Sequence, residues 1–194
     1  MTEQQPYLLI AHERGFELRH YPAYVVAEVT VAGEFDQAGS AGFGPLVGFI
    51  GGRNLASQKI AMTAPVLQAA QSQNAEGQEI AMTAPVIQQA NADGHTVQFV
   101  MPAGMSVEKM PMPADARVSV KQISAHDAAV FRYSGRTTEK IFNRHAMELL
   151  DHVTKSGYEV LGPVRSARFD PPWTPPFMRR NEVIVPVRKK TSAI

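Results

Sequence analysis

The chain contains 194 residues, of which 44% are hydrophobic, and it has no cysteine. This length and composition fit one domain with a hydrophobic core, and the lack of cysteine excludes a disulfide framework, a thiolate metal site, a catalytic thiol and covalent haem attachment. A formal net charge of +1 gives no electrostatic field that favours nucleic acid, so we expect no nucleic-acid partner.

The N-terminal segment shows no targeting pattern. The first 15 residues contain neither a basic region nor a long apolar run. No apolar run elsewhere approaches the roughly 20 residues that a membrane-spanning helix needs. We therefore expect a soluble, cytoplasmic protein without membrane insertion, and we take a monomer as the default.

The first elements are β-like and then helical. Residues 16–31 are rich in valine and tyrosine and predict a bent strand or a hairpin around Tyr21 and Pro22. Residues 34–52 carry apolar side chains near helical spacing. Because an interior proline removes a helical hydrogen bond, Pro45 predicts a break, followed by a second short helix that ends at Gly51 and Gly52.

A heptapeptide then occurs twice, as IAMTAPV at residues 60–66 and again at residues 80–86. Each copy predicts a strand that ends near its proline, since proline cannot donate to a β-ladder. Alternation places Met62 and Met82 on an apolar face of their strands. The duplication either lengthens a hairpin, with methionine as core filler, or builds a methionine-lined ligand wall.

The second half repeats the order of the first. After a strand at residues 96–101 and a loop at 103–116, residues 117–134 are again β-like, with a polar break at 124–127. Thr137 or Thr138 then caps an amphipathic helix, whose apolar stripe is Phe142, Ala146, Leu149, Leu150 and Val153. Strands at residues 162–169 and 182–187 follow, separated by a segment whose four prolines forbid regular structure from 170 to 176.

These elements predict the fold class and the domain organisation. Each half reads as a strand or hairpin, a helix and two strands, which is typical of an α+β domain in which two helices cover a curved antiparallel sheet. We expect a single domain over residues 1–194, with repeated halves at about 7–102 and 117–188.

The polar residues leave several interpretations open. His145 and His152 lie about 10 Å apart along one helix, too far to share one metal ion. His20 ends a strand-like run and is either an ordinary edge residue or a ligand for haem iron. Trp173 and Phe177 either plug the end of the core or cover an apolar pocket. Arg179 and Arg180 either bind a ligand carboxylate or pair with surface acids. The sequence leaves these alternatives open, for the two arginines as for the two aromatic residues.

Four segments carry a resemblance to a known family. In chain order they are FELRHYP, KIAMTAPV, RYSGRTTEKIFNRHAMELL and RFDPPWTPPFMRRNEV. Together they resemble the SOUL haem-binding protein family over roughly residues 7–187. The last segment and the MTAPV motif are the most specific.

The resemblance implies a fold and a ligand. The implied fold is a distorted antiparallel β-barrel flanked by two helices, with a pseudo-twofold β-α-β-β repeat, similar to the gyrase-inhibitor-like effector-binding domains. The implied ligand is haem or another tetrapyrrole, bound non-covalently, with an axial histidine at the position that is His20 here. Because residues 34–52 lack Lys and Arg, propionates on that side would have to meet Arg53, Arg179 or Arg180.

Our leading hypothesis is therefore a non-catalytic tetrapyrrole-binding protein that carries, buffers or senses haem b, with His20 as the candidate iron ligand. The candidate pocket residues are Phe43, Val47, Met62, Met82, Trp173 and Phe177, with Arg179 and Arg180. Two alternatives are a hydrolase that uses Glu182 as general base and a module that recognises a small effector or peptide.

The duplication gives a first prediction. Deleting residues 58–77 removes one whole period, and if one copy belongs to an added hairpin the protein should keep its main sheet. We expect the deletion variant to melt cooperatively, as measured by circular dichroism. Loss of the cooperative transition would show that both copies are integral to the sheet.

Overall fold

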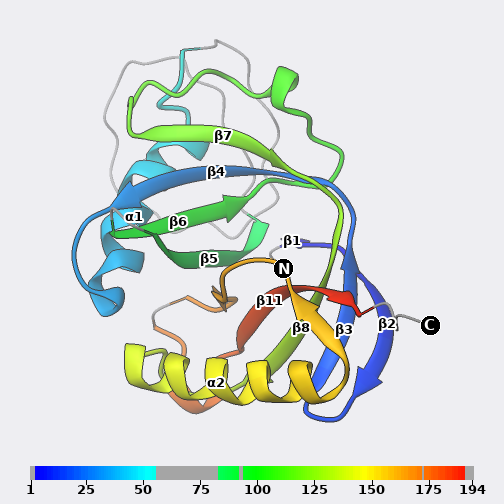
Figure 1. Cartoon of the computed structure of the whole chain (residues 1–194). Coiled ribbons are helices and arrows are strands. Elements are labelled where there is room, and N and C mark those ends of the chain that lie inside the picture. The colour runs from blue at the N-terminus through cyan, green and yellow to red at the C-terminus, as the bar shows by residue number, and fades with distance from the viewer. Residues whose placement is uncertain (1–2, 56–82, 92–93, 172, 191–194) are drawn as a thin grey trace.

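The computed structural model describes residues 3–55, 83–91, 94–171 and 173–190. The first IAMTAPV copy, the start of the second, and the predicted wall residues Met62 and Met82 lie outside these ranges. The described residues form an α+β fold with one large, mainly antiparallel sheet and two α-helices (Figure 1). The prediction of an α+β class with two helices is confirmed.

The sheet contains eleven strands, and two short 3₁₀ helices lie between them. The helices are α1 (Phe35–Ile50), α2 (Glu139–Lys155), η1 (Val107–Lys109) and η2 (Pro176–Met178). The strands are β1 (Glu3–Gln4), β2 (Leu8–Glu13), β3 (Phe16–Tyr21), β4 (Tyr24–Val31), β5 (Thr83–Asn91), β6 (Gly94–Val100), β7 (Val118–Ile123), β8 (His126–Tyr133), β9 (Tyr158–Val160), β10 (Arg165–Arg168) and β11 (Asn181–Lys189).

The strand order is symmetric apart from one extra edge strand. The order is β2-β3-β8-β11-β10-β5-β6-β4-β7; β2 is the extra strand, and β10 and β5 form the central pair of the other eight. In each half, the strand before the helix pairs with the last strand of its own half: β4 pairs with β6, and β8 pairs with β11. On its other side, the same strand pairs with the first strand of the other half: β4 pairs with β7, and β8 pairs with β3. Two repeated halves would produce this arrangement. Among the described residues no pairing joins β2 to β7, so a closed barrel stays a prediction.

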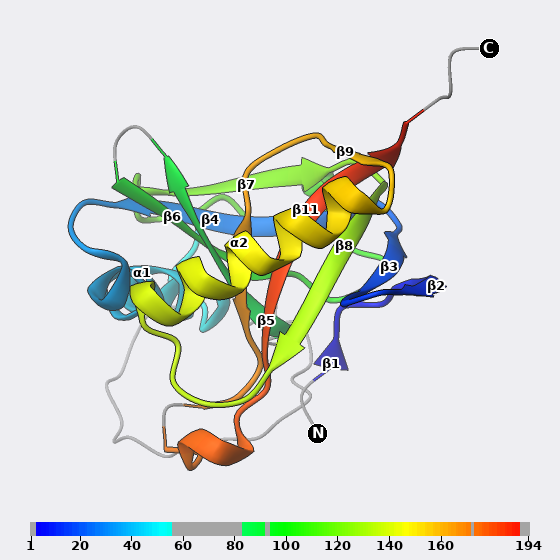
Figure 2. The ribbon, with the colours of Figure 1, turned by 60° about the horizontal axis from the view of Figure 1, so that its bottom comes forward.

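Both helices lie on one face of the sheet, each over its own half (Figure 2). α1 packs on β4, β5, β6 and β7, whereas α2 packs on β3, β8, β9 and β11. The helices meet at their N-terminal ends, where the rings of Phe35 and Phe142 stack with centroids 5.0 Å apart. The opposite, inner face of the sheet carries two smaller apolar clusters, which share Tyr24. The sheet therefore has an outer face covered by helices and a separate inner face.

The predicted break at Pro45 is wrong, because α1 continues through this residue. Proline in a helix interior costs about 3 kcal/mol. Leu46, Phe49 and Ile50 follow it and are fully or almost fully buried, and burying each such side chain contributes about 1.5–3 kcal/mol. Their burial exceeds the cost of the proline. The helix ends where predicted, since Gly52 has a φ of +99°.

The second helix agrees with its prediction. Thr138 is the N-cap, and its side-chain oxygen accepts a hydrogen bond from the backbone N–H of Ile141. Ala146, Leu149 and Val153 of the predicted stripe are buried against β8, β9 and β11. No helix in the described ranges has both the length and the apolar character needed to cross a bilayer.

The strands near the N-terminus differ from expectation in their pairing. Residues 16–31 form two strands around Pro22, as expected for a bent segment, but β3 and β4 do not pair with each other, so the hairpin alternative is wrong. β3 instead lies between β2 and β8, and β4 lies between β6 and β7. β2 itself was not predicted.

The packing of α2 gives a second prediction. Leu149 is fully buried and Met147 on the same helix is 67% exposed. Leu149→Ala should lower the free energy of unfolding by about 2–5 kcal/mol, because it leaves a cavity under the helix. Met147→Ala, the matched control, should change it by less than about 0.5 kcal/mol. Urea denaturation measures both, and equal losses would contradict this packing.

Candidate functional site

A groove of about 360 Å³ opens on the outer face of the sheet, between β2 and β9. Its volume lies in the range of small-molecule and cofactor sites. Apolar side chains supply much of its wall, and a carboxylate or an ammonium group lies at several points of the rim. The lining residues are Ile10, Ala11, Glu13, Leu18, Asp127, Tyr158, Val187 and Lys189.

His20 lies beside this groove. It is two residues from Leu18 on β3, so both side chains are on the same face of the strand. Its direct cross-strand neighbour is Asp127, which lines the groove, and His20 Nδ1 lies 2.7 Å from Asp127 Oδ1. The His20 side chain is 39% exposed. A half-exposed imidazole is thus oriented by a carboxylate at the groove.

The inner face of the sheet carries a buried ion cluster instead. Glu182 on β11 is fully buried, and its two carboxylate oxygens accept hydrogen bonds from Arg19 at 3.0 and 3.2 Å. Arg180 donates to the same carboxylate at 2.7 and 3.1 Å. Glu17 is the second carboxylate partner of Arg19. Bonds to Glu182 and its negative charge outweigh the effect of burial and raise the pKa of Arg19, although burial is the largest single influence and acts to lower it.

This cluster continues along the inner face to a histidine. Arg19 donates to the Tyr21 hydroxyl, and burial raises the pKa of Tyr21 to about 12. The Tyr21 ring stacks on His126, with centroids 5.8 Å apart. His126 Nε2 lies 3.1 Å from Arg165 Nη2, and its Nδ1 lies 2.9 Å from the Ser124 carbonyl oxygen. Because a guanidinium only donates, His126 is neutral with its proton on Nδ1.

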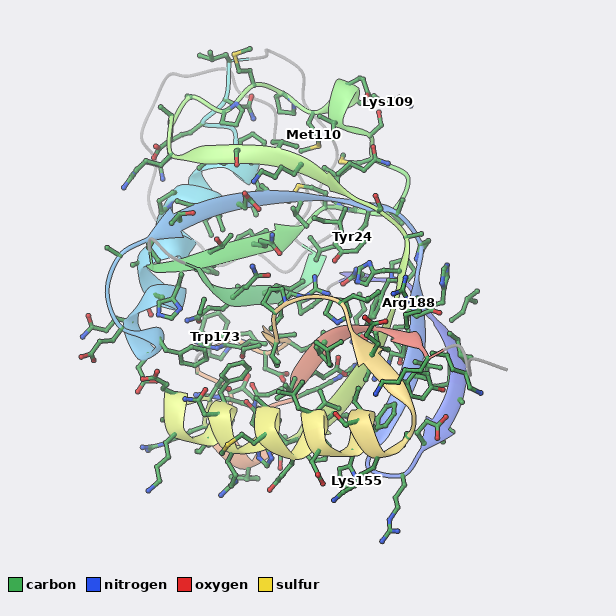
Figure 3. The ribbon with its side chains drawn as sticks, viewed as in Figure 1. Tyr24, Lys109, Met110, Lys155, Trp173 and Arg188 are labelled. Carbon is green, nitrogen blue, oxygen red and sulfur yellow. The ribbon has the colours of Figure 1, made fainter. Side chains whose placement is uncertain are left out.

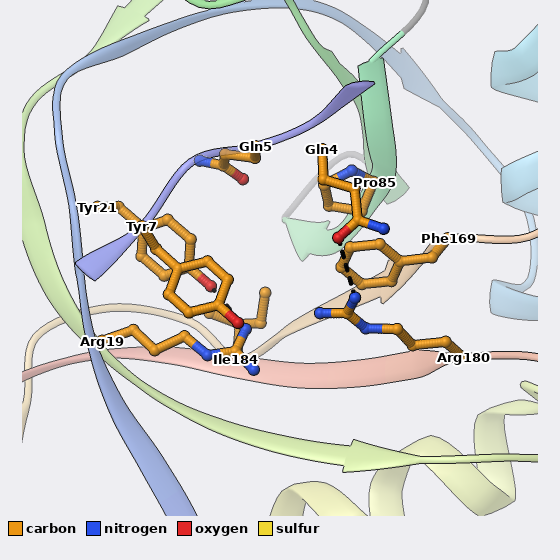
Figure 4. Close-up of a pocket in the computed structure, with 9 residues that line it drawn as sticks. All are labelled: Gln4, Gln5, Tyr7, Arg19, Tyr21, Pro85, Phe169, Arg180 and Ile184. Atoms are coloured by element: carbon orange, nitrogen blue, oxygen red, sulfur yellow. Dashed lines mark hydrogen bonds between the residues drawn. The ribbon is translucent and has the colours of Figure 1, made fainter. Parts of the chain in front are cut away.

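A cavity of about 10 Å³ lies within this inner face (Figure 4). That volume holds about one water molecule. Its walls come from the N-terminal segment and from β3, β5, β11 and the loop between β10 and β11, which brings together residues far apart in the sequence. The lining residues are Gln4, Gln5, Tyr7, Arg19, Tyr21, Pro85, Phe169, Arg180 and Ile184.

The structure does not gather the predicted pocket residues around His20. Phe43 and Val47 lie on α1, which packs on the other half of the sheet from β3. Phe43 is exposed, with its ring edge on Phe99, and Val47 is half-buried at the margin of the core under α1. The predicted wall and His20 therefore belong to different regions.

The proline-rich loop does not plug the core. Trp173, which is labelled in Figure 3, is 67% exposed, and Phe177 is 77% exposed. Arg179 donates to the Thr174 carbonyl oxygen within the loop. Arg180 is the predicted arginine that does reach a cavity, where it binds Glu182 and contacts the Phe169 ring at 4.1 Å. The plug alternative for Trp173 and Phe177 is wrong.

Sequence reasoning missed the residues that complete both regions. Alternation along FELRHY places Arg19 on the face opposite His20, which signals two chemically different faces of β3. Nothing local signals that Asp127 pairs with His20, or that Glu182, Arg180 and Arg165 meet Arg19 and His126. Those contacts join residues up to 163 positions apart.

The chain was compared with known families, solved structures and curated proteins. The sequence profile described as "SOUL heme-binding protein" matches residues 2–73 and 70–186. The crystal structure of the EcmrR C-terminal domain superposes with a TM-score of 0.58 at 14% identity, covering 95% of this chain and 99% of that one. A hydrolase from Listeria innocua superposes with a TM-score of 0.55 at 12% identity, covering 92% and 94%. No curated protein matches by sequence. At these identities the structural likeness shows the fold alone.

The neutral His126 gives a third prediction. Burial, followed by the nearby Arg165 charge, lowers its pKa in the folded protein below the unfolded value near 6.5. The unfolded chain therefore binds this proton more readily, so stability is complete above about pH 6.5 and falls as the pH decreases through the folded pKa. His126→Gln, whose amide oxygen still accepts from Arg165, should flatten the pH dependence of the unfolding free energy between pH 7 and pH 5. Identical slopes in both proteins would contradict this.

Proposed function

Because the chain belongs to the SOUL haem-binding protein family, we propose that it binds haem or a related tetrapyrrole non-covalently in the outer groove, with His20 as the iron ligand. The observation that carries the proposal is the contact between His20 Nδ1 and Asp127 beside this groove. The proposed role is to carry, buffer or sense the tetrapyrrole, without catalysis.

The donor chemistry at His20 fits an axial ligand. When Nδ1 donates its proton to a carboxylate, the neutral imidazole keeps its lone pair on Nε2, and iron-binding histidines commonly have such a partner. Within the described residues, Nδ1 is the ring nitrogen of His20 that has a protein hydrogen-bond partner. Haem would supply an iron that accepts a neutral imidazole.

The surroundings of His20 fit the rest of a tetrapyrrole. Ile10, Leu18 and Val187 offer apolar contact to a macrocycle, and Lys189 offers a charge for a propionate. Leu8, the cross-strand neighbour of His20 on β2, is exposed, as is Ile10. An exposed apolar group of this kind beside a groove supports ligand binding.

The geometry disfavours the hydrolase alternative. A general base needs a lone pair within reach of a substrate proton. Glu182 is fully buried, and both of its oxygens accept hydrogen bonds from Arg19, with Arg180 as a further donor. Two guanidiniums occupy this buried carboxylate and leave it no route to a substrate. The remaining alternative is that the outer groove binds a small effector other than a tetrapyrrole. A haem titration distinguishes this role from haem binding.

A titration with haemin tests the proposal. We expect a Soret shift that saturates at one equivalent. His20→Ala should remove the low-spin spectrum and weaken binding at least tenfold, while Asp127→Asn, which loses the orienting charge, should weaken it about 10–100-fold. His12→Ala is the matched control, because this exposed histidine is the cross-strand neighbour of Glu17 and lies on the opposite face of the sheet from the groove.

The variants also define what would overturn the assignment. An unchanged Soret band and affinity in His20→Ala would exclude His20 as the ligand. Equal losses in His20→Ala and His12→Ala would show that haemin binds to histidines without a specific site. Thermal melts of each variant confirm that the fold is retained.

A further inference from the structure

The strand β2 forms one edge of the sheet, and apolar side chains are exposed on both of its faces. Leu8, Leu9 and Ile10 are 68%, 48% and 50% exposed. Pro6 and Tyr7, which precede them, are exposed as well. Alternation places Leu8 on the outer face and Leu9 on the inner face of the sheet. Five consecutive exposed residues without a charge therefore lie along this edge.

The free side of β2 is open in the part of the chain that the structure describes. There β2 pairs with β3 alone. Figures 1 and 2 both place β2 at the margin of the molecule, with β3 between it and the rest of the sheet. An edge of this kind presents backbone N–H and C=O groups that can hydrogen-bond to a further strand.

The opposite edge of the sheet has a different composition. The exposed residues of β7, the strand at that edge, are Ser119, Lys121 and Gln122, all of which are polar. Charged side chains, lysine above all, keep the edge strands of natural proteins from pairing with other chains. Within β2 the one acidic residue is Glu13, at the last position, and there is no lysine or arginine. The composition of β2 therefore favours pairing with another chain.

The sequence of β2 is complementary to itself in an antiparallel arrangement. A register centred on Leu9 places Leu9 opposite itself and Leu8 opposite Ile10 of a second copy. A bulge between Leu9 and Ala11 leaves Ile10 on the outer face, where it lines the outer groove. Each of these direct pairs thus joins two apolar side chains on the same face of the sheet, which is the arrangement that stabilises paired strands.

We propose that two copies of the chain form a symmetric dimer, in which their β2 strands pair antiparallel about a twofold axis at Leu9. Because the same edge is used by both copies, the interface closes on itself and leaves the polar β7 strands as the outer edges of one continuous sheet. Both outer grooves then open on the same face of this sheet. The dimer requires no haem, and it replaces the monomer expected from the sequence.

Sedimentation velocity without haemin tests the dimer. We expect the unmodified chain to show a monomer–dimer equilibrium over a roughly hundredfold range of concentration, because association depends on protomer concentration. Leu9→Lys should weaken dimerisation about tenfold or more, because it places two ammonium groups directly opposite each other. Met147→Lys is the matched control and should leave dimerisation unchanged, since it puts the same charge on an exposed apolar position of α2.

A single introduced cysteine tests the register, because the unmodified chain has none. Leu9→Cys should form a disulfide between subunits under mild oxidation, since directly opposite Cβ atoms of antiparallel strands are about 4.5–5.5 Å apart. Leu8→Cys should not link to itself, but mixed with Ile10→Cys it should form a disulfide between the two variants. Met147→Cys gives the rate of random collision. These variants keep the test decisive if Leu9→Lys does not fold.

Three results would overturn the proposal. A monomer at every concentration would exclude a second copy as the occupant of this edge and leave a strand of different sequence as its partner. Equal dimerisation of Leu9→Lys and the unmodified chain would place the interface elsewhere on the molecule. Cross-linking of Leu9→Cys no faster than that of Met147→Cys would exclude the register centred on Leu9. Thermal melts establish that each variant is folded before these comparisons are made.

Discussion

The buried carboxylate of Glu182 is the interaction on which the inner face of the sheet depends. A carboxylate removed from water is stable only with good counter-charges and satisfied hydrogen bonds. Arg19 from β3 and Arg180 from the loop before β11 supply both. Arg180 in turn holds Gln4, and the Arg19 guanidinium holds the Tyr7 ring. One acidic residue thereby links two strands and the N-terminal segment on the inner face of the sheet.

The alternation of side chains along each strand explains why the two faces of the sheet offer chemically distinct regions. The strand β3 alternates between them, with Phe16, Leu18 and His20 outward and Glu17, Arg19 and Tyr21 inward. The outward set leads to an apolar groove beside a half-exposed imidazole. The inward set leads to ionised groups stacked on aromatic rings, with little free volume. A single six-residue strand thus contributes to the groove beside His20 on one side and to an ion cluster on the other.

Local sequence patterns predicted most helices and strands, but they did not predict the contacts between residues that are distant in the sequence. The stripe and cap of α2 were predicted correctly because both are encoded in one continuous segment, from Thr138 to Val153. Pro45 misled because the burial of Leu46 and Phe49 against strands from elsewhere outweighs a local penalty. His20 was singled out by its place at the end of FELRHY and then by the family resemblance, but its partner Asp127 follows only from the register of β3 with β8. The pairing of β3 and β4 with other strands likewise depends on the whole sheet.

The interleaved strand order has a consequence for how the protein is made. His20 and Asp127, which meet on β3 and β8, are 107 residues apart, and the duplicated heptapeptide lies between them. A ribosome adding about 5–20 residues per second leaves β3 without its second neighbour for on the order of 10 s. During that time the nascent N-terminal half exposes unpaired strand edges at β3 and β4, which are sites for association between chains. Neither half can complete its own sheet, so the newly made chain keeps these strand edges open until β7 and β8 emerge.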